Sequence, residues 1–240
     1  RTDPALATKV LKVVNSAFYG LPSQIANLDR AIVMLGLSAV KNIALAASLS
    51  RLFRPGAISE RFDATDLWAH CVSVGVCARL LAQAGGGTQV EEAFVGGLVH
   101  DVGLLIEYQL FPEEVKTLVQ RVEKGEGTLP ALEQEMFGAD HQAIGAYLAG
   151  KWKFPPALRS AISYHHNPQM LQPALRRFVT TITVADTICC QNEIAFHLSA
   201  RHQEVDEGML EQIGLTVAKV GEVLEALPER IAEANAIFKE

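Results

Sequence analysis

The sequence has 240 residues, of which 49% are hydrophobic and 20% are charged, a balance typical of a globular protein that buries a sizeable core. Its formal net charge of -6 gives it no positive field, so binding to the phosphate backbone of a nucleic-acid polymer is not expected. The length fits one large domain or two small ones.

The N-terminal part of the chain carries the signals of three helices. Asp3-Pro4 provides an N-cap acceptor followed by proline at the first helical position, and an apolar stripe then runs to Val14. Two more apolar segments each follow a small polar residue, and Arg54-Pro55-Gly56 ends the second of them. The two segments span residues 27–36 and 38–53. We expect residues 1–54 to form a compact helical section, with a boundary near residues 54–62.

Helix signals continue through the rest of the chain. A longer helix is expected over residues 63–84, and Thr88 with Glu91 fits a capping box that starts the next helix toward His100. No segment shows the sustained period-two alternation of a half-buried strand, so we predict an all-α protein of about a dozen helices. Further helices are expected to begin at Pro112, Pro130, Asp140 and Pro156, to span residues 173–191, and to form a pair over residues 216–238 on either side of Pro228.

The longest apolar stretch does not predict a membrane span. Residues 32–49 are interrupted by Lys41 and Asn42, and a charge at the centre of a spanning helix costs roughly 2.5–3.5 kcal/mol. We therefore expect buried helices and no membrane association. The chain opens within a helix signal and has no start methionine, so we expect it to be a piece of a longer protein.

The four cysteines favour a reducing, cytoplasmic setting. They show no C-x-x-C spacing, so neither a zinc knuckle nor a disulfide framework is indicated. We expect reduced thiols at Cys71, Cys77, Cys189 and Cys190.

Histidines and carboxylates recur at helix signals in a pattern that suggests a metal site. Asp101 and Asp186 each lie in an apolar segment, where an ionised carboxylate is costly unless it meets a cation or a donor. Imidazole and carboxylate groups converging from several helices suit Fe, Mn, Ni or Zn. His197 and His202 lie in a polar stretch and are expected at the surface. The other five histidines are His70, His100, His141, His165 and His166.

These residues carry a resemblance to a known family. The order His70, His100-Asp101, His141, His165-His166, Asp186 resembles the ligand order of HD-superfamily metal phosphohydrolases. Over about residues 1–190 the chain is similar to the HDOD family of that superfamily. The resemblance implies a multi-helix bundle with an N-terminal helical part at 1–54 and an HD-like core at 62–191. We expect a single domain over residues 1–240, whose C-terminal helices at 205–240 are not part of the family pattern. The similar segments are 3–22, 31–37, 97–103, 137–145, 152–155 and 161–168.

The resemblance also implies a function. HDOD domains resemble the HD-GYP phosphodiesterases that open cyclic dinucleotides, but they are generally regarded as regulatory. All the ligand positions are retained here, which implies one or two divalent transition-metal ions. Leu104, however, stands where HD-GYP enzymes carry a lysine, and Asn167-Pro168 stands where they carry a glutamate. We expect a bacterial signal-transduction domain that binds a nucleotide or a partner protein; the alternative is a metal-dependent phosphohydrolase.

Three alternatives remain open from the sequence. The histidines and carboxylates could form a metal-free, hydrogen-bonded polar cluster. Asp66 could be a further ligand beside His70, or it could be an acid in a first helical turn that the helix dipole stabilises. The segment 15–22, with Phe18 and Tyr19, could be a partner-binding loop or the packed corner of a helix.

Overall fold

The computed structural model describes residues 4–16, 24–49 and 56–238. These residues form helices and no β-strand, apart from one isolated antiparallel bridge between Ala57 and Asp63, so the all-α prediction is confirmed. The helices are α1 (Pro4–Val14), α2 (Leu28–Leu35), α3 (Leu37–Leu49), α4 (Ala64–Ala84), α5 (Val90–Val99), α6 (Val102–Leu110), α7 (Pro112–Glu123), α8 (Leu129–Phe137), α9 (His141–Lys151), α10 (Pro156–Tyr164), the 3₁₀ turn η2 (Pro168–Met170), α11 (Pro173–Gln191), α12 (Glu207–Ile213) and α13 (Val217–Phe238).

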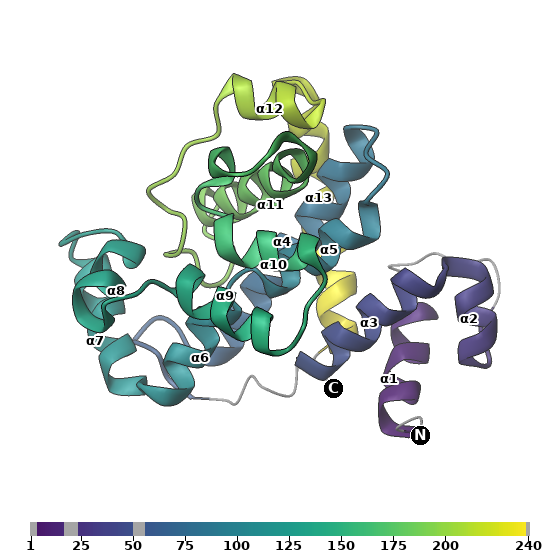
Figure 1. Cartoon of the computed structure of the whole chain (residues 1–240), viewed down its shortest axis with the longest axis horizontal. Helices are drawn as coiled ribbons and strands as arrows, with labels where there is room; N and C mark the ends of the chain where they lie inside the picture. The colour runs from purple at the N-terminus through teal and green to yellow at the C-terminus, as the bar shows by residue number, and fades with distance from the viewer. Residues whose placement is uncertain (1–3, 17–23, 50–55, 239–240) are drawn as a thin grey trace.

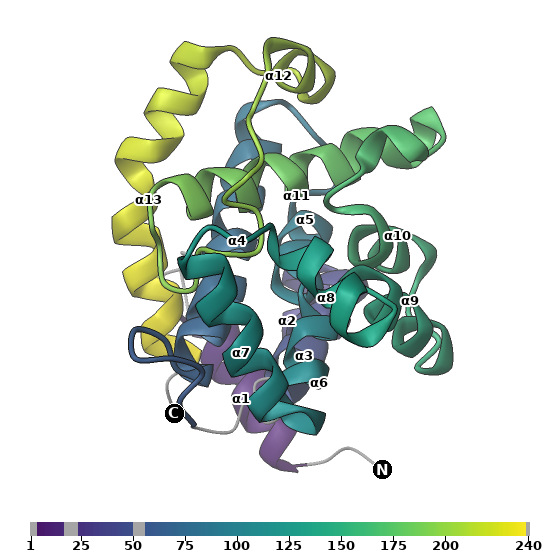
Figure 2. The same cartoon turned by 90° about the vertical axis from the view of Figure 1, so that its left-hand side faces the viewer.

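Helix α4 lies at the centre of the fold. Its side chains are apolar on nearly every face, which is the pattern of a helix enclosed on all sides. Helices α5, α11 and α13 pack against it, and Figure 2 shows α13 running alongside it. By length and composition alone α4 could cross a membrane, but here it is a core helix of the bundle.

Glycines allow two pairs of helices to approach unusually closely. Gly97 on α5 faces Gly75 on α4, and a Cβ at Gly97 would lie 2.7 Å from the Gly75 nitrogen. A Cβ at Gly103 on α6 would collide with the backbone carbonyl of His141 at the start of α9. These approaches draw the helices that carry His70 and His141 toward the junction of α5 and α6.

The N-terminal helices form a section with its own small core. Figure 1 shows α1, α2 and α3 to one side of the main body. Their apolar side chains cluster together. The side-chain amide of Asn15 donates a hydrogen bond to the carbonyl of Ile25 and accepts one from its backbone amide. Helix α3 packs against α5, and Leu45 contacts the main core. Phe18, Tyr19 and the end expected near Arg54-Pro55 lie outside the described residues.

The structure corrects two of the local predictions. Thr88 and Glu91 do not form a capping box: α5 follows Gln89 without a side-chain cap, and Glu91 accepts a hydrogen bond from Arg79 on α4 at 3.0 Å. The tail is one helix, α13, and continues through Pro228. A proline inside a helix costs about 3 kcal/mol, and burial of apolar residues of α13 such as Leu227 offsets that cost.

Gly97→Ala is expected to lower the free energy of unfolding by about 1–3 kcal/mol, because the added methyl group meets backbone atoms of α4 that cannot move independently. Urea denaturation would measure the change. Gly221→Ala is the matched control: apart from neighbouring residues and the backbone of its own helix, no atom lies within 4 Å of the position that its Cβ would take, and alanine favours a helix by up to about 1 kcal/mol. Equal stability of the two variants would contradict the close α4–α5 packing.

Candidate metal centre

The structure brings together all of the side chains that the sequence analysis singled out as metal ligands. They come from α4, the α5–α6 junction, the start of α9, the end of α10 and α11. All but one have no exposed surface, and His166 is 9% exposed. The residues are His70, His100, Asp101, His141, His165, His166 and Asp186.

The pairs His100-Asp101 and His165-His166 lie at helix ends, so both members of each pair can point toward the centre. Neighbouring residues within a helix point about 100° apart, so a pair inside a helix would diverge. His100 and Asp101 instead lie between the end of α5 and the start of α6, and His165 and His166 directly follow the last residue of α10. Each pair therefore delivers two side chains to the centre.

The carboxylate of Asp101 lies between two groups of histidines. Its Oδ2 is 3.3 Å from Nε2 of His100 and 3.8 Å from Nε2 of His70. Its Oδ1 is 3.4 Å from Nε2 of His141 and 3.3 Å from Nε2 of His165. One carboxylate thus faces both halves of the centre with different oxygens.

Each half of the centre contains a compact set of nitrogen and oxygen atoms. In one half, Oδ1 of Asp186 lies 3.1 Å from Nε2 of His70 and 3.7 Å from Nε2 of His100. In the other, Nε2 of His141 lies 3.0 Å from Nε2 of His166 and 3.3 Å from Nε2 of His165. Each set has the spacing of a group that could hold a metal ion.

Contacts on the outer side of the rings orient two of the histidines. Nδ1 of His100 lies 2.6 Å from the carbonyl oxygen of Gly97, and Nδ1 of His165 lies 3.1 Å from that of Ala161. A carbonyl oxygen only accepts hydrogen bonds, so Nδ1 donates and the Nε2 lone pair of the neutral ring faces inward. Metal-binding histidines typically have this arrangement.

Several inward atoms make no hydrogen bond among the described residues. They include both oxygens of Asp101, Oδ2 of Asp186 and Nε2 of His70 and His100. Buried polar atoms are normally paired, so a metal-free hydrogen-bonded cluster would leave this centre poorly satisfied. Mixed imidazole and carboxylate donors are the ligands that first-row transition metals favour, and the residues present fit such ions.

The charges of the centre shift its pKa values in opposite directions. Burial lowers the pKa of His100, but the charges of Asp101 and Asp186 outweigh burial and raise that pKa well above its usual value. Burial raises the pKa of Asp101 and Asp186, yet the charge of His100 brings both well below the usual range. For His166, burial and the nearby histidines lower the pKa.

A pair of glutamates behind His141 was not found from the sequence. Oε2 of Glu133 on α8 accepts hydrogen bonds from the backbone amide of His141 at 2.9 Å and from its Nδ1 at 2.7 Å. Glu107 on α6 is also buried, and burial together with the charge of Glu133 raises the pKa of Glu107 to about 9. Glu107 interrupts an apolar segment, the same signal that identified Asp101, and that signal could have revealed it.

Other candidates have structural roles or need correction. Oδ2 of Asp66 accepts a hydrogen bond from the amide of Asp63 in the capping box of α4, so Asp66 acts at the helix start. The prediction that His197 lies at the surface is wrong: it is 3% exposed, and its ring packs 5.1 Å from that of Phe62. His202 is exposed as expected, yet its ring centroid lies 6.1 Å from that of His166.

The cysteines are all buried free thiols, as predicted. Burial raises the pKa of Cys190 well above its usual value, with the charge of Asp186 adding to the effect. The Cys190 thiol donates a hydrogen bond to Oδ1 of Asp186 at 3.5 Å and so helps to orient that carboxylate.

The chain matches a known protein family and an individual relative. The sequence profile of the HDOD domain matches residues 1–168, so Asp186 lies beyond the matched segment. An uncharacterized protein of Treponema pallidum (strain Nichols) is 27% identical over 187 residues, which make up 77% of this chain. The aligned region represents 35% of that relative, so the chain spans about a third of its length.

Solved structures share the fold over nearly the whole chain. An HDOD domain protein of unknown function from Geobacter sulfurreducens matches with a TM-score of 0.79 and 23% identity, covering 98% of this chain and 83% of that one. A protein of Shewanella amazonensis SB2B, provisionally named a phosphohydrolase, has a TM-score of 0.69 and 26% identity over 99% and 82%. A protein of Marinobacter aquaeolei VT8, provisionally named a signal transduction protein, has a TM-score of 0.80 and 22% identity over 99% and 53%.

Glu133→Gln is expected to weaken metal binding by about 10–100-fold, because an amide cannot replace the charged acceptor that orients His141. Glu135→Gln is the matched control, since Glu135 lies on the same helix but forms an exposed ion pair with Arg121. Titration with Mn²⁺ or Zn²⁺ would measure both affinities. Equal affinities would show that Glu133 does not support the centre.

Metal binding is expected to release protons and to tighten as the pH rises. A coordinating imidazole must be neutral, but the charges of Glu133 and Asp101 outweigh burial and raise the pKa of His141 to about 10. Protons therefore compete with the metal below that pH, and each proton released raises the apparent affinity by up to about tenfold per pH unit. Calorimetry between about pH 6 and pH 8 in buffers of different ionisation enthalpy would count the protons. An affinity independent of pH would count against ligation by His141.

Proposed function

The chain belongs to the HDOD domain family, and we propose that it is a regulatory signal-transduction domain built around a histidine and aspartate metal centre. In this proposal the whole of residues 1–240 acts as one domain that binds a nucleotide or a partner protein. The observation that carries the proposal is the position of Asp101, whose two oxygens face two separate sets of buried imidazoles. The buried free thiols fit a bacterial cytoplasmic protein.

The proposed centre would hold one or two divalent transition-metal ions. Asp101 would be among the ligands, and such ions would supply Lewis-acid chemistry toward phosphate esters. The donor set suits Fe, Mn, Ni or Zn. The other ligands would be His70, His100 and Asp186 in one set and His141, His165 and His166 in the second.

The surroundings of the centre favour binding over fast catalysis. Leu104, at the position of the HD-GYP lysine, is 1% exposed and packs in an apolar cluster with Leu105 and Leu118. Among the described residues, the ion-pair partners of Asp101 and Asp186 are all histidines. Loss of one preorganised donor costs roughly 100–1,000-fold in rate in other enzymes. We therefore infer slow or absent hydrolysis of cyclic dinucleotides.

A metal-dependent phosphohydrolase is the second candidate function. The likeness to the Shewanella protein provisionally named a phosphohydrolase supports it, as does the chemistry of the donor set. In that case the same residues would serve the hydrolysis of a phosphate ester other than a cyclic dinucleotide. Its transition state would need less stabilisation by a cation at the position of Leu104.

The purified protein is expected to contain about one or two transition-metal ions per chain, and Asp101→Ala is expected to lose most of them because both sets of ligands share that carboxylate. Elemental analysis would measure the content. Turnover of cyclic di-GMP is expected to be at least about 100-fold slower than that of an HD-GYP enzyme. Fast metal-dependent turnover, abolished by Asp101→Ala, would instead assign the chain to the enzymes.

A further inference from the structure

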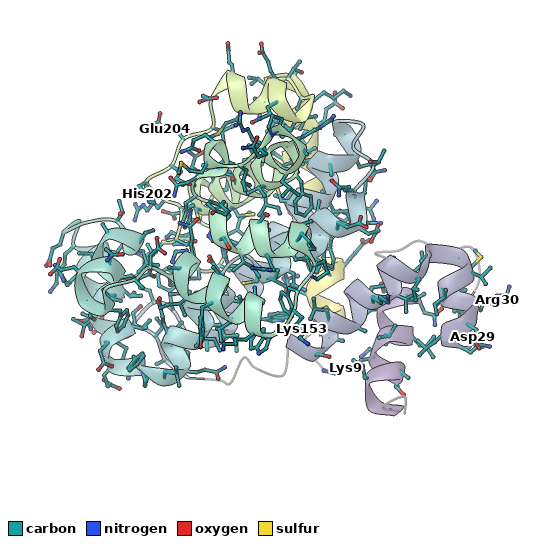
Figure 3. The ribbon with its side chains drawn as sticks, in the orientation of Figure 1. Lys9, Asp29, Arg30, Lys153, His202 and Glu204 are labelled. Atoms are coloured by element: carbon teal, nitrogen blue, oxygen red, sulfur yellow. The ribbon has the colours of Figure 1, made fainter. Side chains whose placement is uncertain are left out.

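The side chains of the metal centre meet the molecular surface at His166. Among the side chains of the centre, His166 is the one with exposed surface, at 9%, while the others have none. The ring of His202 lies next to that of His166. Figure 3 shows His202 on the segment that connects α11 and α12 at the edge of the molecule. His202 therefore lies beside the one side chain of the centre that has exposed surface.

His202 also lines a cavity of about 380 Å³. The other walls are the turn between α7 and α8 and the segment of the chain around Arg201. The His202 ring thus borders this cavity and lies 6.1 Å, centroid to centroid, from the ring of His166. Binding sites for small molecules are typically about 300–1,000 Å³, so the cavity has room for a small ligand.

Two cations without partners line the cavity. Lys124 and Arg201 form no ion pair or side-chain hydrogen bond among the described residues. Nearby Arg121, by contrast, is held by Glu126 and Glu135. Glu123 also lines the cavity, so the formal charge of the lining is +1 when His202 is neutral. The two cations exceed the single carboxylate of the lining, and hydrogen bonds from cationic groups to an anion are strong.

The start of α8 adds to the attraction for an anion. Gly127 and Thr128 line the cavity, and Thr128 is the N-cap of α8 but makes no side-chain capping bond. The start of a helix carries partial positive charge and is a common partner of phosphate groups, although Pro130 in the first turn of α8 has no amide hydrogen to donate.

From these contacts we propose that the cavity is a phosphate subsite of the metal centre, in which Lys124 and Arg201 bind the phosphate group of a mononucleotide-sized molecule. This inference rests on the proposed metal-binding function and names the ligand class. Among the described residues, Lys124 and Arg201 form no ion pair with Asp101 or Asp186, so they would bind the ligand without adding a charge at the carboxylates of the centre. Binding of that kind raises occupancy without raising the rate of a chemical step, which suits a regulatory domain.

The test is calorimetric titration of the metal-loaded protein with inorganic phosphate and with adenosine monophosphate, using adenosine as the probe that lacks phosphate. The double variant Lys124→Gln/Arg201→Gln is expected to bind both phosphate probes at least about tenfold more weakly, because two charge-assisted contacts are lost. Its metal content is expected to remain unchanged. Lys219→Gln/Arg230→Gln is the matched control, since it removes the same charges from α13 and should bind like the unaltered protein.

Each outcome separates the subsite from the metal centre. If the control variant binds the phosphate probes as weakly as the Lys124/Arg201 variant, the loss reflects the net charge of the protein and not a subsite. If the Lys124/Arg201 variant binds the phosphate probes with unchanged affinity, the proposed subsite is overturned. Binding of adenosine as tight as that of adenosine monophosphate would also overturn it. Absence of metal in the unaltered protein would refute the proposed function. In that event, phosphate binding by the metal-free protein that still depends on Lys124 and Arg201 would preserve the cavity as an anion site.

Discussion

Asp101 and Asp186 are fully buried in a helical core, and an ionised carboxylate in such a position is strongly destabilising unless cations or several donors surround it. The structure surrounds them with imidazoles from several places in the chain, so the need to compensate two charges organises the centre of the fold. Hydrogen bonds within the protein do not complete the compensation, because both Asp101 oxygens remain without one among the described residues. Metal ions are the partners whose charge and preferred ligands match what is left.

The same need explains features that lie away from the ligands. Gly97 and Gly103 allow backbones to meet where a side chain would separate the helices that bear the histidines. Helix ends fall at His100-Asp101 and at His165-His166, so that each pair presents two side chains. Behind His141, Glu133 provides the charged acceptor that sets the orientation of the ring. The fold therefore fixes the ligands from their outer side as well as by helix position.

In the proposed function, holding metal and recognising a ligand are distinct tasks. The buried histidines and carboxylates have the chemistry for the first, and the exposed cations around the cavity beside His202 have the chemistry for the second. The segment matched by the family profile ends at residue 168, so it includes Lys124, whereas Asp186 of the centre and Arg201 of the cavity both follow it.

The sequence by itself determined the helical class, most helix starts and the identity of the central residues. Asp63, Asp140 and Pro156 are local signals that act within one turn, and acids in apolar segments reveal a buried charge without reference to neighbours. Tertiary structure alone decided which distant groups meet. Glu91 pairs with Arg79 instead of capping α5, His197 is buried, and Lys124 faces the same cavity as Arg201. Each of these outcomes depends on how helices far apart in the chain pack, and no spacing within a single segment contains that information.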